Sequence, residues 1–356
     1  MASQLVIQYT AEKAYVIGND LNIGITMENS GEQNILIRKP LTSSELLRYD
    51  LFSIQKENKE VAYAGALFHS DKNTESISLP PKESLKFSVS IAKEYLLDDS
   101  GNYSLKIRAD ALLYDRDNTV ITPSTLSFSL SIGDELPVLT HSQIAQKISK
   151  SSIKYKEFGN GHRIYNSFSN KDVANTQEAH EVAEKALKYI IKQSVYSFPF
   201  SLFFPLTFLS SFSKAYGEMF CNSKHDDWNT LVTTYSKMRD YIKEGMKYWY
   251  SGKHCDPGDY GYVFPADTDK NIYFCDEYVK AQNTPTLTKK YDSKAGVHIH
   301  EISHKAASTE DHFYSYGDCK LKASSCDLLT INNADCVQIF AELVYVDDDV
   351  VTKVDL

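Results

Sequence analysis

Five residues, His300-Glu301-Ile302-Ser303-His304, constrain this chain more than any other stretch, because their chemistry requires a helix. On a helix, positions i and i+4 lie one turn apart on the same face, so both imidazoles can reach one ion while Glu301 points at its open side. Zn²⁺ held by two His and a third ligand keeps a water whose pKa is lowered to about 7, and a carboxylate can take its proton. Chance alone produces an H-E-x-x-H string in roughly 2% of chains this long, so the flanking residues must decide.

The third ligand separates the subclasses of such zinc sites. The pattern H-E-x-x-H-x-x-G-x-x-H is excluded, because Ala307 and Glu310 stand where it needs Gly and His. Glu342 is a formal candidate for a ligand on a later helix, but no recognisable motif surrounds it. After the zinc motif the chain reads Thr-Glu-Asp-His-Phe-Tyr-Ser-Tyr-Gly over residues 309–317, which offers an aspartate instead.

This stretch resembles the aspzincin (deuterolysin) family of zinc metalloendopeptidases, whose catalytic domains carry H-E-x-x-H followed by G-T-x-D-x-x-Y-G. The match keeps Thr309, Asp311 and Tyr314, and it departs at both glycines, where Ser308 and Ser315 stand. The resemblance implies a mainly helical (α+β) zincin-like catalytic domain and zinc-dependent cleavage of proteins or peptides.

Roles for individual residues follow from the resemblance. The implied ligands of one zinc ion are His300, His304 and Asp311. Glu301 is the expected general base, which deprotonates the water and passes the proton to the leaving amine. Tyr314 matches the tyrosine whose phenol hydrogen-bonds the developing oxyanion. His298 and His312 are not needed as ligands, and each is expected to be a surface imidazole or one that supports the ligands.

Residues 333–341, Asn-Ala-Asp-Cys-Val-Gln-Ile-Phe-Ala, carry a second motif, similar to the family's N-A-D-S-Y-E-Y-F-A helix. The resemblance is closest to the peptidyl-Lys branch, which cleaves on the amino side of lysine with an Asp and a Glu that bind the lysine ammonium. Asp335 matches the first, but Gln338 stands at the second and brings no charge. Asp335 either lines this pocket or anchors the helix that begins there. The sequence therefore leaves a preference for Lys after the scissile bond open.

The length and charge of the chain limit the number of domains and the class of partner that it can have. A chain of 356 residues is long enough for two domains, and a net charge of −9 gives no electrostatic footprint for nucleic acid. The N-terminal residues contain no basic segment followed by an apolar run. We therefore expect either a secreted protein shown without its signal peptide or one that is exported by another route.

All six cysteines lie in the C-terminal part of the chain, which favours an oxidising destination for that part. Cys255 and Cys275 flank two short apolar runs that predict a hairpin, and the family has a disulfide with this separation, so the resemblance implies a Cys255–Cys275 bond. Cys319 and Cys326 either pair across a short loop or are free buried thiols.

The first 134 residues predict strands, because apolar residues alternate with polar ones in four segments (residues 21–27, 85–91, 103–109 and 126–132). Turn signals space these segments as in a β-sandwich, and the stretch also resembles the pro-domain of the peptidyl-Lys branch. We expect an immunoglobulin-like sandwich over residues 1–134, a connector over 135–160 and the aspzincin domain over 161–356.

The connector 135–160 contains several lysines and predicts a solvated linker or a short basic helix. It is also a candidate maturation site, since an enzyme that prefers lysine could cut its own precursor there. Our hypothesis is that the sandwich acts as an intramolecular pro-domain that keeps the protease latent. A full-length chain that is fully active and never becomes shorter would contradict this hypothesis.

The C-terminal part contains two helical patterns, one that starts near Asn175 and one over residues 227–248. Between them, Val195 to Phe212 carries no charge and fits no family pattern. Its prolines and serines make a spanning helix improbable, which leaves a buried loop or a surface for a membrane or partner. The rival function is a non-catalytic or membrane-acting toxin or binding protein on a protease scaffold, but the intact motif residues argue against it.

Overall fold

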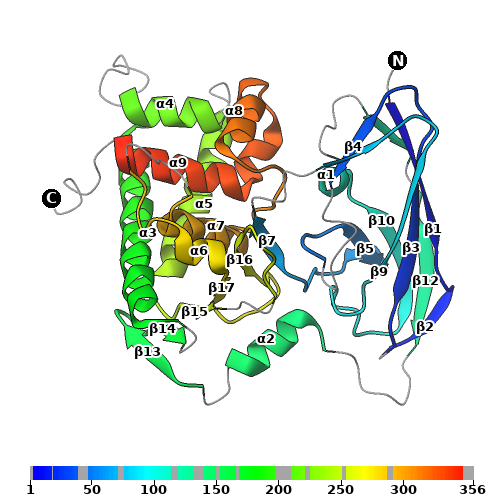
Figure 1. Cartoon of the computed structure of the whole chain (residues 1–356), viewed down its shortest axis with the longest axis horizontal. Coiled ribbons are helices and arrows are strands. Elements are labelled where there is room, and N and C mark those ends of the chain that lie inside the picture. The colour runs from blue at the N-terminus through cyan, green and yellow to red at the C-terminus, as the bar shows by residue number, and fades with distance from the viewer. Residues whose placement is uncertain are drawn as a thin grey trace. The chain divides into compact units, whose positions relative to one another are not determined.

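In the computed structural model, contacts between residues group the chain into two units (Figure 1). The first contains Met1–Leu67, Lys72–Ser151 and Phe264–Thr268, and the second contains Phe68–Asp71, Ser152–Val263 and Asp269–Leu356. The structure describes residues 3–17, 19–38, 47–70, 76–113, 119–122, 124–131, 139–149, 153–165, 168–197, 210–220, 225–250, 254–286 and 292–347. The main division falls within the expected connector, but each unit also takes one short segment from the other half of the sequence.

Alternating strands build the first unit. In β3 (Asn22–Asn29), Ile23, Ile25 and Met27 are buried while their neighbours are partly or fully exposed. The sheets have the strand orders β11-β1-β3-β9, β2-β12-β10-β5-β6 and β4-β8, and apolar side chains fill a common core. The other strands are β1 (Ser3–Thr10), β2 (Ala14–Val16), β4 (Ile35–Arg38), β5 (Phe52–Lys56), β6 (Lys59–Glu60), β8 (Ser76–Leu79), β9 (Ser84–Ser90), β10 (Gly101–Ile107), β11 (Thr119–Thr122) and β12 (Leu126–Ser131). Helices α1 (Ala109–Leu112) and α2 (His141–Ser149) accompany them, so part of the connector is the short helix that was one of its two expected forms.

A six-stranded mixed sheet and several helices build the second unit. The sheet has the order β13-β14-β15-β17-β16-β7. Its strands are β7 (Leu67–Ser70), β13 (Tyr155–Phe158), β14 (His162–Tyr165), β15 (Lys247–Tyr250), β16 (Asp259–Val263) and β17 (Asn271–Phe274). The helices are α3 (Asn170–Ser197), α4 (Ser210–Met219), α5 (His225–Ile242), α6 (Asp276–Lys280), α7 (Lys294–Ala307), α8 (Tyr316–Ser324) and α9 (Ala334–Asp347). The expected hairpin is present as the antiparallel pair β16 and β17, within a sheet larger than the sequence predicted.

The second predicted helix ends earlier than expected. Helix α5 stops at Ile242, and β15 begins at Lys247, inside the range 227–248 that the pattern assigned to a helix. Gly245 between them adopts a left-handed conformation with φ 69°, which ends a helix without steric cost. The apolar residues after it pack as a strand rather than as a further helical turn.

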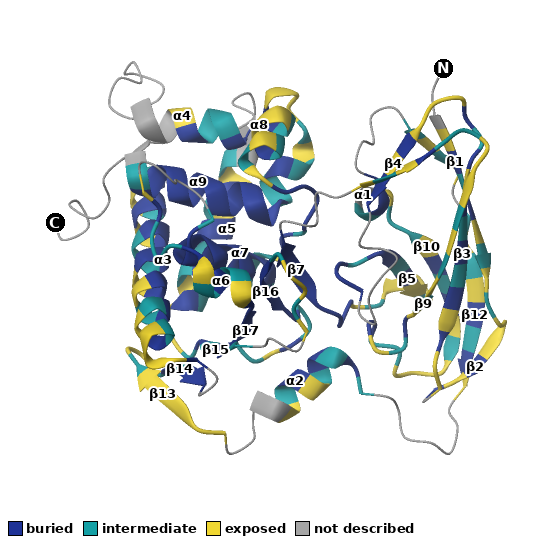
Figure 2. Cartoon of the chain, in the orientation of Figure 1, coloured by how far each residue is buried: buried dark blue, intermediate teal, exposed yellow. Residues whose placement is uncertain are grey.

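Burial is greatest around α7 and α9, which Figure 2 shows almost entirely in dark blue, while α3 also carries exposed residues. Every residue of α7 from Lys294 to His304 is buried. Among the helices of the described residues, none is long and apolar enough to cross a membrane. Most of the uncharged stretch, residues 198–209, lies outside the described residues.

Two disulfides are present among the described residues. Cys255 is bonded to Cys275 with Cα atoms 5.7 Å apart, and Cys319 is bonded to Cys336 with Cα atoms 5.5 Å apart. A Cys319–Cys326 bond and a free Cys319 were the alternatives that the sequence offered, and both are wrong. Cys319 lies on the buried side of α8, which packs against α9, so its partner comes from α9.

Candidate active site and metal centre

Helix α7, which carries the H-E-x-x-H motif, has defined caps at both ends. Ser293 Oγ accepts a hydrogen bond from the Gly296 amide (3.0 Å), and Glu342 accepts hydrogen bonds from the Ser293 amide (3.0 Å) and hydroxyl (2.6 Å). At the other end Ser308 adopts the left-handed conformation, and its amide donates to Ser303 O. The chain thus reverses directly after the motif, towards Asp311. Glu342, the formal ligand candidate, instead serves the start of this helix.

The side chains of His300, His304 and Asp311 converge at one point. The two Nε2 atoms lie 3.1 Å apart, His300 Nε2 lies 3.2 Å from Asp311 Oδ1, and His304 Nε2 lies 3.3 Å from Asp311 Oδ2. All three side chains are at most 1% exposed. They form a group whose ligand atoms could hold one metal ion.

An oxygen atom lies close to the outer nitrogen of each ring. His304 Nδ1 lies 2.7 Å from Thr309 O, and His300 Nδ1 lies 3.0 Å from Asp335 Oδ1. A proton on each Nδ1 is favoured by these oxygens, and it leaves the Nε2 lone pairs directed at the point where Asp311 lies. Two imidazole nitrogens and one carboxylate match the donor set of a catalytic zinc site, so the residues fit this ion.

The loop that carries Asp311 is fixed by the start of α9. Asn333 Oδ1 accepts hydrogen bonds from the amides of His312 (2.9 Å) and Phe313 (3.1 Å), and the Glu310 amide donates to Asn332 O (2.8 Å). Asp335 Oδ2 accepts from the Ser315 amide (2.8 Å). Residues at the start of the 333–341 motif therefore hold in place the loop that carries Asp311.

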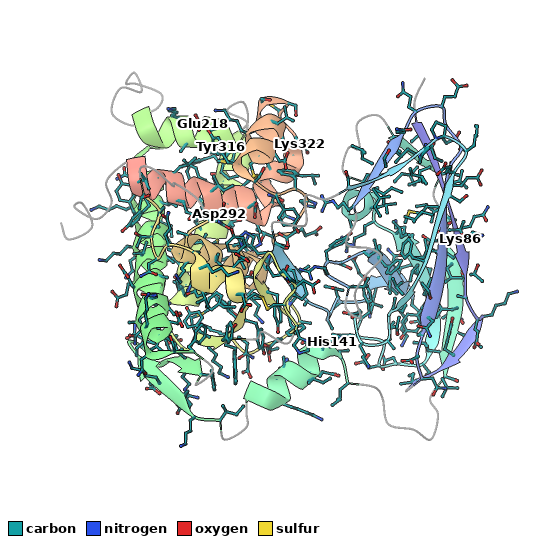
Figure 3. The ribbon with its side chains drawn as sticks, viewed as in Figure 1. Lys86, His141, Glu218, Asp292, Tyr316 and Lys322 are labelled. Atoms are coloured by element: carbon teal, nitrogen blue, oxygen red, sulfur yellow. A yellow bond between two sulfur atoms is a disulfide. The ribbon has the colours of Figure 1, made fainter. Side chains whose placement is uncertain are left out.

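Beyond this loop, α8 is tied to α4. Figure 3 shows Tyr316 beside Glu218, and the Tyr316 hydroxyl donates to the Glu218 carboxylate (2.7 Å). Tyr314, the expected oxyanion donor, lies between Asp311 and α8 and is 4% exposed. It is thus held in a short segment with an anchor on each side.

Glu301 is completely buried beside the two imidazoles. Gly261 in β16 makes room for it, because a Cβ at position 261 would lie 3.0 Å from Glu301 Oε1.

Burial raises the pKa of the Glu301 carboxyl well above its ordinary value, although the His300 ring opposes this. Burial also acts to raise the pKa of Asp311, but His304 and His300 outweigh it and hold this pKa below its usual range. The two carboxyls are thus suited to different tasks, proton transfer and ligation.

The two residues expected in a lysine pocket are both engaged elsewhere. Asp335 contacts His300 and Ser315, as described above, and Gln338 is completely buried with its amide nitrogen 3.1 Å from Glu342 Oε2. The anchoring role of Asp335, one of the two alternatives for this residue, therefore has direct contacts in the structure.

His298 and His312 are not surface residues, so that part of the expectation is wrong. His298 is completely buried, and its Nε2 lies 2.9 Å from the Tyr278 hydroxyl, because α7 is covered on the side opposite to the ligands as well. His312 is 6% exposed.

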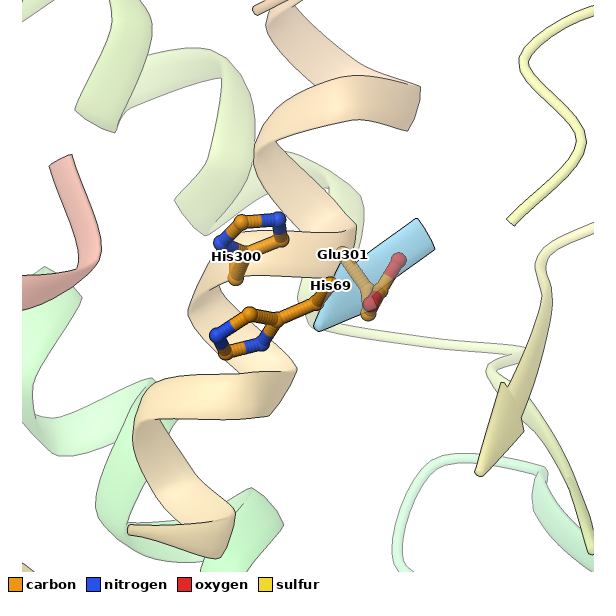
Figure 4. A group of neighbouring side chains, drawn as sticks. All are labelled: His69, His300 and Glu301. Carbon is orange, nitrogen blue, oxygen red and sulfur yellow. The ribbon is translucent and has the colours of Figure 1, made fainter. Parts of the chain in front are cut away.

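Sequence reasoning missed His69. This residue lies on β7, in the segment Phe68–Asp71 that belongs to the second unit, and Figure 4 shows its ring against that of His300 with Glu301 beside them. The ring centroids are 4.0 Å apart and the planes differ by 7°. Burial lowers the pKa of His69 to about 3, so the ring is neutral near pH 7. No local pattern marks this histidine, because its partners lie about two hundred residues further along the chain.

The segment that carries most of this site is similar to known proteins. Residues 209–342, which contain all the convergent side chains except His69, match the aspzincin family model described as lysine-specific metallo-endopeptidase. Over these residues the chain is similar to the aspzincin family of metalloendopeptidases, whose metalloproteases are zinc-dependent.

Two relatives align with most of this chain. An "Extracellular protease" of Aeromonas hydrophila is 23% identical over 333 residues, covering 91% of this chain and 88% of the relative. A "Peptidyl-Lys metalloendopeptidase" of Armillaria mellea is 25% identical over 360 residues, covering 96% and 92%. A solved zinc peptidase from Grifola frondosa covers 49% of this chain and 96% of its own, with 20% identity and a TM-score of 0.40.

Proposed function

We propose that this chain holds one zinc ion through His300, His304 and Asp311, and hydrolyses peptide bonds with Glu301 as its general base. The observation that carries the proposal is the convergence of two buried imidazole nitrogens, 3.1 Å apart, on the Asp311 carboxylate, whose two oxygens lie 3.2 Å and 3.3 Å from them, beside a buried carboxyl. Zinc, when bound, would polarise the substrate carbonyl and acidify the attacking water.

The protein residues then divide the work. Glu301 takes the proton of the attacking water and delivers it to the leaving amine, and burial raises the pKa of this carboxyl, which favours holding the proton between the two steps. Tyr314 donates a hydrogen bond to the developing oxyanion, which typically contributes about 3 kcal/mol. Thr309 and Asp335 hold the two imidazoles in the orientation that exposes their Nε2 atoms.

A preference for Lys after the scissile bond is the finer part of this proposal. Support comes from the match to the lysine-specific family model and from the similarity of residues 333–341 to the peptidyl-Lys motif. Of the two motif residues only Asp335 carries a charge, because Gln338 is neutral and its amide binds Glu342. We therefore expect a weaker discrimination for lysine than two carboxylates would give.

The remaining parts of the proposal concern the precursor. We expect the N-terminal unit to be an immunoglobulin-like pro-domain, the chain to be a latent secreted form, and maturation to occur within 135–160. The strand alternation of residues 1–134, the lysines of the connector and the name of the Aeromonas relative support these expectations.

One set of measurements tests the proposal. The purified chain and its Glu301→Ala variant are analysed for zinc and assayed on casein and on lysyl peptides, with and without a chelator. We expect one zinc per chain in both proteins, hydrolysis only by the wild type once it has been cut within 135–160, and loss of that activity with the chelator. Mass-spectrometric mapping of the products then reports lysine preference and any cut within 135–160. A chain that binds no zinc, or a Glu301→Ala variant as active as the wild type, would contradict the proposal.

A further inference from the structure

One side chain of the site comes from the N-terminal half of the sequence. His69 lies on β7, which is the edge strand next to β16 in the sheet of the second unit. Ser70 Oγ donates to Gly258 O (3.3 Å), and the Phe68 ring lies 4.8 Å from that of Tyr262. The neighbours of His69 on both sides are therefore attached to the β16 segment, and an added edge strand is how sheets commonly bind extended peptides.

The ring of His69 is enclosed by residues of the site. It stacks on His300 at 4.0 Å and on Tyr260 at 5.0 Å, and its Nε2 lies 3.7 Å from Asp335 Oδ1. Its ligand atom also lies within 4.8 Å of those of His300 and Glu301. The side chain is only 4% exposed, so it occupies this position rather than approaching it from solvent.

The stacking distinguishes a blocking ring from a further ligand. A metal ion bound by an imidazole nitrogen lies near the plane of that ring. The planes of His69 and His300 are almost parallel and their centroids are 4.0 Å apart, so one ion cannot lie in both planes. His69 therefore fills space next to the ligands and the base without joining the ligand set.

We propose that His69 is the residue that closes the catalytic site of the unprocessed chain, by filling with its ring the space beside His300 and Glu301 that a substrate would need. This proposal rests on the proposed function and names the group responsible for latency. Cutting the connector 135–160 leaves His69 within the N-terminal fragment, so the site opens only when β7 also leaves β16.

The test measures access to the metal rather than turnover. Three chains are compared in a Glu301→Gln background, which prevents self-cleavage: the parent, His69→Ala and His69→Phe. Each is loaded with Co²⁺, and binding of acetohydroxamate, a small metal-binding compound, is followed by the visible absorption of cobalt. Circular dichroism verifies the fold, and His69→Ser replaces His69→Ala if the latter does not fold.

We expect His69→Ala to bind acetohydroxamate at least tenfold more tightly than the parent, while His69→Phe, which keeps a ring but no nitrogen, stays close to the parent. Equal affinity in all three chains would overturn the blocking role and leave the proposed zinc function standing. An equal gain in the Ala and Phe variants would show that the nitrogen acts rather than the ring, and would also overturn it. If no chain binds cobalt, the proposed metal site itself fails, and the role of His69 fails with it.

Discussion

Ser308 and Ser315 adopt backbone conformations that favour glycine, and they are the two positions at which this chain departs from the glycines of the family motif. Ser308 has φ 57° and ψ 38°, and Ser315 has φ 82° and ψ 153°. A Cβ costs free energy in both regions. Ser315 recovers part of this cost, because its hydroxyl accepts a hydrogen bond from the Asp318 amide and caps α8. The glycines of the family motif thus mark two turns, and this chain keeps the conformations of these turns with serine in place of glycine.

Ser308→Gly should stabilise the fold. Ser308 is exposed, and the change relieves the left-handed strain. We expect the free energy of unfolding to rise by about 0.5–1 kcal/mol, measured by urea denaturation. Ser324→Gly, at an exposed helical position of α8, is the matched control and should lower it by a similar amount. A destabilised Ser308→Gly protein would show that the strain at this turn is negligible.

Asp335→Asn tests how His300 is oriented. The variant keeps the shape of the side chain but removes the charge that faces His300 Nδ1 at 3.0 Å. We expect the dissociation constant for zinc to rise about 10–100-fold, measured by competition with a chromogenic chelator. The ratio of kcat/KM for lysyl over alanyl peptides is measured on the zinc-saturated variant. An unchanged zinc affinity with a lost preference for lysine would instead assign Asp335 to the substrate pocket.

At the scale of elements, the close approach of β16 to α7 sets the position of Glu301. A Cβ on Gly261 would lie 3.0 Å from Glu301 Oε1 and 3.0 Å from Tyr273 O, and the latter belongs to the paired strand and cannot withdraw. Gly261→Ala should therefore displace the base and lower kcat by about tenfold, with a smaller change in KM. Gly317→Ala is the control, since its Cβ would meet only Ser315 Oγ at 3.8 Å. An unchanged kcat in Gly261→Ala would mean that Glu301 adjusts without loss.

The elements of the site differ in how far sequence alone reveals them. Helix α7 and the strands β16 and β17 follow from a motif or a local periodicity, and so does most of α3. The predicted end of α5 is wrong, because the apolar residues that continue its pattern pack in β15 after the left-handed turn at Gly245. The sequence could not assign strand β7 to the six-stranded sheet of the second unit, because β7 pairs with β16, which lies about 190 residues further along the chain. Local patterns report which face of an element is buried, but not against which distant segment.

At the scale of the whole molecule, buried histidines make stability depend on pH. His162, His180 and His298 lie close together in the core of the second unit, with ring centroids 4.2 Å apart for His162 and His180 and 6.3 Å apart for His180 and His298. Burial lowers the pKa of each ring. His180 Nδ1 lies 2.7 Å from the Tyr248 hydroxyl, which can donate to a neutral ring. The core is therefore built for uncharged imidazoles.

The variant His180→Asn measures how much one such ring contributes to the pH dependence of stability. Burial first, and the charges of His162 and Lys188 next, lower the pKa of His180 from 6.5 to about 3. Between these values the unfolded chain binds a proton at this site and the folded chain does not, so stability is lost as the pH falls. From pH 6.5 to 4.5 this amounts to about 2–3 kcal/mol. We expect His180→Asn, whose amide oxygen can still accept from Tyr248, to lose that much less stability than the wild type over this range, measured by urea denaturation at each pH. His254→Asn, at an exposed histidine, should retain the slope of the wild type. Parallel pH profiles for wild type and His180→Asn would mean that the folded core accepts the proton at this site as readily as the unfolded chain does.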